Sequence, residues 1–319
     1  MVLDTPLSID TQDLLTDQNI CFNQPLPIAI LNPSNRKYHD LESRTYGLPC
    51  DEEELDRLNL QHSNFVTVFD GSNPDLSRLV LNSVKNDIRP GSKVIDLGCG
   101  TGAWILDMAK AYPDSKFFGV DIADVFPKHD LPPNISFSIM DISKPLTFEK
   151  NSFDFINARL IIVSITEERW PTILKECYNI LKPGGLVQFM EYDHIASNGD
   201  ENTMRFVRGL YGAMKKNHQD FFVSNKLSGL LRFAGFNNVK EDRRILELTS
   251  IDADGTELSK RILENWTRAL IGFRPFILPF ICPNDPDSYD LLLEENIKGC
   301  IEQRWFKQAV GVTGMKPLV

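Results

Sequence analysis

The segment VIDLGCGTGAW (94–104) constrains the fold most, because a run of aliphatic residues changes there into glycines spaced two residues apart. The apolar run KVIDL (93–97) predicts a buried strand, and a helical window begins at residue 102. A strand, a glycine turn and a helix N-terminus in this order bring backbone N–H groups close to a ligand. The glycines alone leave two ligands open: a dinucleotide (Gly98-x-Gly100-x-x-Ala103) and a nucleoside joined to methionine (Asp96-x-Gly98-x-Gly100-x-Gly102).

From Lys93 onward, strand-like and helix-like segments alternate. The predicted strands are KVIDL (93–97), KFFGVD (116–121), ISFSIM (135–140), FDFINA (153–158), GLVQFMEY (185–192), FNNVKEDRRILELTS (236–250) and RWFKQAVGVTG (304–314). The predicted helices are 102–112, a short piece near 124–130, 167–181, 203–217 and 224–234, with LKPGG (181–185) as a turn. This alternation predicts an α/β fold with helices on both faces of a sheet. We expect a Rossmann-like, doubly wound sheet of seven strands, mostly parallel with an antiparallel last strand.

The chain is expected to have four regions. They are a loosely ordered segment 1–35, an N-terminal helical cap 36–92, a core made of 93–250 and 304–319, and a helical insert 251–303 between the last two strands. In the cap, Asp51 followed by Glu54 is typical of a helix start. In the insert we expect helices near 256–270 and 287–300, with Pro275, Pro279 and Pro283 breaking any long helix. The insert is either a lid over an apolar acceptor pocket or a cap that packs on helices alone.

Carboxylates at the strand ends distinguish between the two ligands. Asp96 lies two residues before the first glycine, where it would repel a pyrophosphate and attract the ammonium group of an amino acid. Asp121 ends the next strand and can accept hydrogen bonds from ribose hydroxyls in either ligand. Asp141 ends the third strand, where it can accept from the adenine amine while Met140 or Ile142 packs on the ring. Together these positions predict S-adenosylmethionine, with an NAD site as the less favoured interpretation.

The motifs VIDLGCGTG, GVDI, MDIS, FDFINARLI and LKPGGLVQFMEY resemble, in order, those of class I methyltransferases. The segments GTGAWILDMAKAYPDSKFFGVDIADVFP, LPPNISFSIMDI and NSFDFINARLI are similar to fungal LaeA-like methyltransferases, which are associated with secondary metabolism. The lead-in RKYHDLESRTYGLPCDEEELDRLNLQH (36–62) resembles that group as well. The group's frequent tryptophan after the third-strand acid is absent, and DISKPLTF stands in its place. The resemblance spans roughly 36–192 and implies a methyltransferase that uses S-adenosylmethionine.

The residues expected to bind this cofactor lie in the glycine turn, at the strand ends and in the lead-in. They are Asp96, Gly98, Cys99, Gly100, Gly102, Trp104, Asp121, Ile122, Met140, Asp141, Ile142, Asn157, Arg159 and Tyr46. Two of them have alternatives: Trp104 as a core residue and Arg159 in a surface or interface salt bridge. No metal site is expected, because the six cysteines are scattered without ligand spacing.

Catalytic candidates follow from the chemistry of methyl transfer. Alignment of the acceptor atom, methyl carbon and sulfur supplies much of the acceleration, and a base is needed only where the acceptor must lose a proton. His194 and Glu191, after the fifth strand, are candidates for that base. His62 on the N-terminal helix is a third catalytic candidate, because that helix is expected to fold over the cofactor. The alternatives are a solvated loop position for His194 and a packing role for His62.

Charge and composition limit the partners. A net charge of −10 without a basic run argues against nucleic acid. The longest apolar stretch, LIGFRPFILPFICP (270–283), is too short to span a membrane, and we expect a cytoplasmic or nuclear protein. The expected partner is a small, fairly apolar acceptor, methylated at O, N or S. The alternative is a regulatory or protein-methylating protein that acts through protein partners.

Overall fold

A computed structural model describes residues 36–38, 47–70, 88–194, 199–249 and 255–318. Its elements are α1 (Glu52–Asp70), β1 (Lys93–Leu97), α2 (Ala103–Ala111), β2 (Lys116–Asp121), β3 (Ile135–Ile139), β4 (Phe153–Arg159), α3 (Arg169–Ile180), β5 (Leu181–Asp193), α4 (Glu201–Lys216), α5 (Val223–Ala234), β6 (Asn237–Glu247), α6 (Glu257–Ile281), η4 (Pro286–Ser288), α7 (Tyr289–Glu302) and β7 (Phe306–Met315). The predicted segment 1–35, residues 71–87 of the predicted cap and the candidate Tyr46 lie outside the described residues.

The strands form one sheet of seven in the order β3-β2-β1-β4-β5-β7-β6, mostly parallel with one antiparallel strand. This confirms the predicted Rossmann-like fold. β1 pairs in parallel with β2 on one side and with β4 on the other. The strand order therefore reverses between β1 and β4, and ligands bind outside the carboxyl ends of the strands at such a point. The glycine turn that follows β1 lies at this position.

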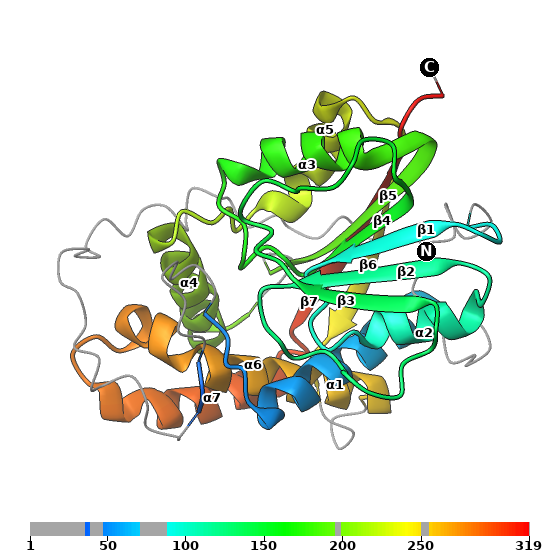
Figure 1. Cartoon of the computed structure of the whole chain (residues 1–319). Helices are drawn as coiled ribbons and strands as arrows, with labels where there is room; N and C mark the ends of the chain where they lie inside the picture. Colours follow the sequence, from blue (N-terminus) through cyan, green and yellow to red (C-terminus); the bar gives the residue numbers. More distant parts are fainter. Residues whose placement is uncertain (1–35, 39–46, 71–87, 195–198, 250–254, 319) are drawn as a thin grey trace, which may run out of the picture. The chain divides into compact units, whose positions relative to one another are not determined.

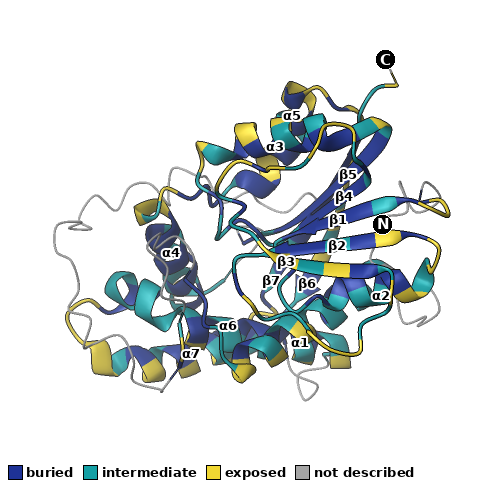
Figure 2. Cartoon of the chain, viewed as in Figure 1, coloured by how far each residue is buried: buried dark blue, intermediate teal, exposed yellow. Residues whose placement is uncertain are grey.

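Chain contacts divide the protein into two compact units. The sheet unit contains Leu58–Tyr192, Gln219–Arg244 and Ala309–Val319, and the helical unit contains Met1–Arg57, Asp193–His218 and Ile245–Gln308. In the sheet unit, α2 covers one face of the sheet, while α3 and α5 pack together on the other (Figure 1). The central strands are buried, whereas the edge strand β3 is partly exposed (Figure 2). This pattern is expected of a sheet covered on both faces.

In the helical unit, α4 packs against α6 and α7. Asp51 precedes α1, and its Oδ1 accepts a hydrogen bond from the backbone N of Glu54 at 3.1 Å. This side-chain cap confirms the predicted helix start. The same carboxylate accepts two hydrogen bonds from Arg36, at 2.6 and 2.9 Å. Among the described residues, no helix combines the length and apolar character needed to cross a membrane.

Local sequence signals were wrong at three places. Residues 124–130 form no helix, and LKPGG belongs to β5, which begins at Leu181 directly after α3. The third difference is larger, because α6 continues through Pro275 and Pro279 to Ile281.

Packing between helices explains why α6 is not broken. Each interior proline disfavours a helix by roughly 3 kcal/mol. The last turn of α6, however, lies directly against two glycines of α4. A Cβ at Gly209 would lie 2.6 Å from Ile281 Cγ1, and one at Gly212 would lie 2.5 Å from Phe280 Cδ1. This close contact buries the turn that follows the prolines, and such burial outweighs intrinsic propensity.

Candidate functional site

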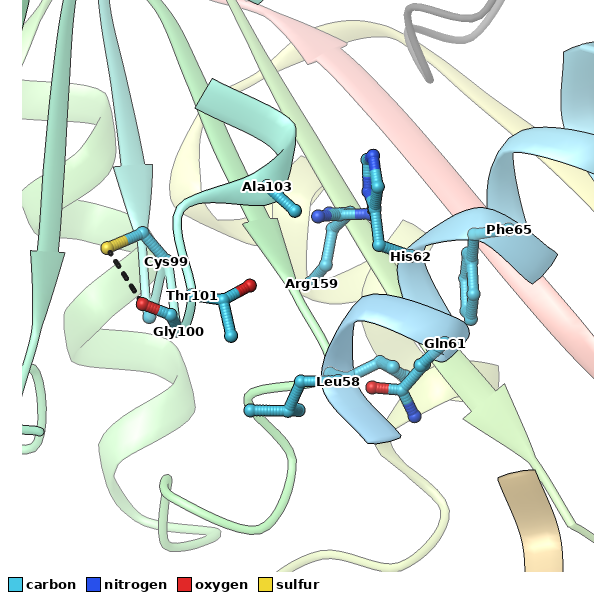
Figure 3. A pocket seen from close by; sticks show the side chains of 11 residues that line it. Leu58, Gln61, His62, Phe65, Cys99, Gly100, Thr101, Ala103 and Arg159 are labelled. Atoms are coloured by element: carbon cyan, nitrogen blue, oxygen red, sulfur yellow. Dashed lines mark hydrogen bonds between the residues drawn. The ribbon is translucent and has the colours of Figure 1, made fainter. Parts of the chain in front are cut away.

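A pocket in the sheet unit opens where the glycine turn, the end of β4 and the helix α1 meet (Figure 3). The residues that line it are Leu58, Gln61, His62, Phe65, Gly98, Cys99, Gly100, Thr101, Ala103, Arg159 and Leu160. The pocket thus gathers five residues predicted to bind cofactor or to act in catalysis with six that were not predicted. The four residues from α1 recur at the spacing of one helix face, a signal that was present in the sequence.

The glycine turn is held against β2 by backbone hydrogen bonds. The N–H groups of Gly98 and Cys99 both donate to the carbonyl of Val120, at 2.8 and 3.0 Å. Gly98 has a φ of +72°, and a Cβ there would lie 2.7 Å from Ile161 Cγ2. Glycine at this position therefore allows both the left-handed backbone and the close approach of the chain that follows β4.

Asp96 is a buried carboxylate at the base of this turn. It is 1% exposed, and its Oδ1 accepts a hydrogen bond from Asn157 Nδ2 at 2.7 Å. Asn157 in turn accepts from Gln188 Nε2 at 2.9 Å. The second oxygen of Asp96, Oδ2, is buried and finds no hydrogen-bond partner among the described residues. Burial raises the pKa of Asp96 to about 7, against the lowering effects of Arg159 and Asn157.

A buried acceptor without a donor is costly, and a cationic ligand group would relieve that cost. The ammonium group of methionine is such a donor. Arg159, which lines the pocket, is close enough for its charge to lower the pKa of Asp96. A carboxylate and a guanidinium at one glycine turn complement the two charges of an amino acid. The residues present therefore fit the methionine portion of S-adenosylmethionine.

The acids predicted to bind the nucleoside lie beside the same turn. Both oxygens of Asp121 accept backbone hydrogen bonds, from Gly100 N at 2.8 Å and from Ala123 N at 2.9 Å. A carboxylate has about four acceptor sites, so its two oxygens retain capacity for ribose hydroxyls. The end of β3 is joined to it, because Met140 N donates to the carbonyl of Asp121 at 2.8 Å. Ile122, Asp141 and Ile142 follow these two strand ends.

Ile142 approaches the turn from the side of β3. It is buried, and its Cδ1 would lie 3.6 Å from a Cβ at Gly98. The neighbouring Asp141 accepts a hydrogen bond from Ser143 N at 2.9 Å through Oδ1. Gly102 completes the turn as the N-cap of α2, with a φ of +74°. Asp121 and Ile142 thus lie beside the glycine turn, where the ends of parallel strands meet.

Of the predicted cofactor residues that the structure describes, Gly98, Cys99, Gly100 and Arg159 line the pocket, and the others lie outside its lining. Two of those others, Trp104 and Asn157, belong to the core. Trp104 is fully buried and packs against Phe155, with ring centroids 6.3 Å apart. At the second position of α2 its side chain lies in the core, which was the alternative interpretation. Asn157 is also fully buried and supports Asp96 from the neighbouring strand. In the part of the chain that the structure describes, no three His, Cys, Asp or Glu residues are placed to hold a metal ion.

His194, a candidate base, belongs to the core of the helical unit. Its ring lies 5.7 Å from that of Trp266, and the residue is 7% exposed. Burial lowers the pKa of His194 well below its ordinary value, and the nearby Lys307 acts in the same direction. The imidazole is therefore neutral and packed against an aromatic ring, which differs from the solvated loop histidine considered from the sequence.

Glu191, the other candidate base, lies within β5 and holds the turn that follows β4. Its Oε1 accepts a hydrogen bond from Ile161 N at 2.9 Å, and its side chain is fully buried. This turn contains Leu160 in the left-handed region, with a φ of +54°, and directs Ile161 toward Gly98. Burial raises the pKa of Glu191 well above its ordinary value, although Ile161 and Ile162 donate to it. Burial therefore favours the protonated form of Glu191.

Replacing Glu191 with glutamine should leave most of the turnover intact, because the amide keeps a carbonyl acceptor for the turn. Glu191→Ala should lower the free energy of unfolding by about 1–3 kcal/mol, because it leaves buried N–H groups without an acceptor. Urea unfolding and methyl-transfer rates of the two variants test this expectation. Loss of turnover in Glu191→Gln at unchanged stability and cofactor affinity would instead support a general base.

Comparisons with known proteins show the family of the chain. Residues 94–185 match a family described as a methyltransferase domain. The chain is 30% identical over 229 residues to the secondary metabolism regulator LAE1 of Cochliobolus heterostrophus, covering 68% of this chain and 71% of that protein. It is 30% identical over 161 residues to the protein-methionine methyltransferase laeA of Emericella nidulans, covering 50% of this chain and 40% of that protein.

A solved structure supports the fold. The crystal structure of the [4+2]-cyclase SpnF aligns with 86% of this chain and 100% of its own, at a TM-score of 0.50 and 17% identity. The fold alone therefore does not specify the reaction. The chain spans 71% of LAE1 but only 40% of the Emericella protein. With 30% identity across 71% of LAE1, and a methyltransferase domain over 94–185, the chain belongs to the LaeA-like family of S-adenosylmethionine-dependent methyltransferases.

Proposed function

We propose that this protein transfers the methyl group of S-adenosylmethionine to an O, N or S atom of a small, fairly apolar acceptor in secondary metabolism. The observation that carries the proposal is the pair of opposite charges at the glycine turn. Asp96 offers a buried oxygen without a described partner, and Arg159 lines the adjoining pocket. These groups are suited to the ammonium and carboxylate of the methionine portion. The glycines of the turn let its backbone approach this part of the ligand closely.

The bound cofactor supplies an activated methyl group on a sulfonium. The protein then has to align the acceptor atom with the methyl carbon and exclude water. Leu58, Phe65 and Leu160 give the pocket an apolar wall. Gln61 adds one amide to that wall, within 3.4 Å of the Tyr192 hydroxyl. An apolar wall with a single amide favours a fairly apolar molecule that is oriented by few hydrogen bonds.

A net charge of −10 further supports an acceptor other than nucleic acid. Acceptors with a free lone pair, such as amines or thioethers, need no proton removed before transfer. The proposal therefore does not depend on a dedicated base.

The second candidate function is methylation of a protein, or regulation through protein partners. It is favoured by the described roles of two relatives, a regulator in Cochliobolus and a protein-methionine methyltransferase in Emericella. The chain spans 40% of the latter protein.

Methyl-labelled S-adenosylmethionine distinguishes these functions. The protein is incubated with a metabolite extract, with a protein extract, and alone, and the label is then counted in organic-soluble products and in protein. We expect label in organic-soluble products. At a cofactor concentration near the native Kd, Asp96→Asn should reduce this label strongly, whereas Asp114→Asn, which replaces an exposed acid in a turn, should not. Label on protein only would overturn the small-molecule proposal and support the second candidate.

A further inference from the structure

Three polar side chains from three elements of the sheet unit are linked in a row, and two of them, His62 and Arg159, line the pocket. His62 comes from α1, Asp107 from α2 and Arg159 from the last position of β4. His62 Nε2 lies 3.0 Å from Asp107 Oδ2, and its Nδ1 lies 3.2 Å from Arg159 Nη1. Figure 3 shows the imidazole and the guanidinium side by side. His62 therefore bridges a carboxylate and a guanidinium that lie 52 residues apart in the sequence.

The chemistry of the two neighbours determines which nitrogen of His62 carries the proton. A guanidinium has only donors, so Nδ1 must accept the hydrogen bond from Arg159. The proton then resides on Nε2, which donates to the carboxylate of Asp107. The opposite tautomer would place an N–H group against another N–H group. His62 is thus a neutral imidazole with both nitrogens engaged, and its lone pair cannot remove a proton from an acceptor in this arrangement.

The surroundings favour the same neutral form. Burial lowers the pKa of His62, and although Asp107 raises it, the charge of Arg159 lowers it further. The charged and titratable groups that face Arg159 are Asp96, Tyr192 and Asp107. Two carboxylates thus balance the guanidinium, while the imidazole contributes no charge.

The arrangement leaves one edge of Arg159 without a hydrogen-bond partner in the described part of the chain. Nη1 is bonded to His62, whereas Nε is buried and has no hydrogen-bond acceptor among the described residues. A guanidinium edge can hold a carboxylate through two parallel hydrogen bonds, but only when its plane is oriented toward that carboxylate. Nδ1 of His62 is a hydrogen-bond acceptor beside the guanidinium, and Asp107 holds the imidazole in place. Together they fix the orientation of the guanidinium plane.

We propose that His62 is a positioning residue: held by Asp107, it orients Arg159 to bind the carboxylate of the cofactor's methionine portion. The inference rests on the cofactor of the proposed function but not on the identity of the methyl acceptor. His62 then acts through Arg159, in contrast to the direct catalytic role considered from the sequence.

The test compares two ligands that differ by one group. S-adenosylmethionine carries the carboxylate, and decarboxylated S-adenosylmethionine lacks it. The affinity of each is measured by calorimetry for the native protein and its variants. Arg159→Ala and His62→Ala should each weaken binding of S-adenosylmethionine by about 10- to 100-fold, as expected for a charge-assisted hydrogen bond. Both should change the affinity for the decarboxylated ligand much less, so the ratio of the two affinities falls.

Matched variants sharpen the comparison. His62→Asn places a carbonyl oxygen near the position of Nδ1 and should restore part of the ratio. His129→Ala removes an exposed histidine outside the pocket and should leave the ratio unchanged. If His62→Ala fails to fold, His62→Gln serves instead, because its amide reaches toward Asp107 but offers Arg159 no acceptor at Nδ1.

Two outcomes would overturn the proposal. Equal weakening of both ligands in His62→Ala would show a merely structural role. Unchanged affinities with lost turnover would instead support a direct catalytic role for His62. Binding is measured without an acceptor, so methylation of protein in place of a small molecule would refute the proposed function and leave this result intact.

Discussion

Asp96→Asn should bind S-adenosylmethionine at least about 30-fold more weakly than the native protein while folding normally. Asparagine keeps the oxygen that accepts from Asn157 Nδ2 but removes the negative charge. Loss of one partner from a buried charge pair costs about 2–5 kcal/mol, which corresponds to a factor of roughly 30 to several thousand in affinity. The ammonium of the ligand would then lie beside a neutral amide.

Without cofactor, Asp96→Asn should be at least as stable as the native protein above neutral pH, although its affinity for the cofactor falls. Burial raises the pKa of Asp96 from 3.8 to about 7, so the folded protein holds this proton more tightly than the unfolded chain. Stability from this group is fully present below pH 3.8 and is lost as the pH rises through about 7. Asp96→Asn has no such titration. At pH 8 it should therefore melt at or above the temperature of the native protein.

Thermal melts with and without cofactor, at pH 5 and pH 8, measure both effects. The native protein should gain melting temperature from the cofactor, and more at pH 8, where Asp96 is ionised. The variant should gain little at either pH. A cofactor-induced shift in Asp96→Asn equal to that of the native protein would contradict the assignment of Asp96 to the ammonium group.

Gly102→Ala should lower the free energy of unfolding by about 2–5 kcal/mol, the sum of two separate costs. The φ of +74° at this position costs a residue with a side chain about 1–2 kcal/mol. The new Cβ would also lie 2.5 Å from the ring tip of Phe137, and such crowding costs about 1–3 kcal/mol. Phe137 cannot move away freely, because its ring stacks on Phe126 with centroids 4.9 Å apart.

Gly91→Ala provides a control that carries only the cost of a positive φ, without crowding of the new Cβ. Gly91 has a φ of +84°, but a Cβ there would meet nothing within 4 Å. Urea unfolding should therefore show a loss of only about 1–2 kcal/mol in this variant. Cofactor affinity should fall in Gly102→Ala, whose substitution displaces the turn, and remain unchanged in Gly91→Ala. Equal destabilisation of the two variants would show that contact with Phe137 is not important.

The positions at the ends of the strands were predictable from sequence for a simple reason. In parallel strands the carboxyl ends meet at one edge, so residues that follow apolar runs are brought together. Asp96 of β1 lies opposite Gly119 of β2 and Asn157 of β4 in the register of the sheet. Asp121 then follows at the end of β2, where it contacts the backbone of Gly100.

Interactions across elements could not be predicted in the same way. Asp107 had no role in the sequence interpretation, because its partner His62 lies 45 residues away on another helix. Glu191 was a candidate base, but its carboxyl group holds the backbone of Ile161. Alternation along β5 places residue 191 on one face, yet it does not specify which neighbour that face meets.

The sequence by itself determined the sheet, the glycine turn and the acids at the strand ends, because these follow from local periodicity and from the geometry of parallel strands. Only the tertiary structure decided that α6 runs through Pro275 and Pro279, and that His62 joins Asp107 to Arg159. Both depend on packing between distant segments. Contacts between helices outweigh the cost of an interior proline, and the tautomer of a histidine follows from the groups that the fold places at its two nitrogens.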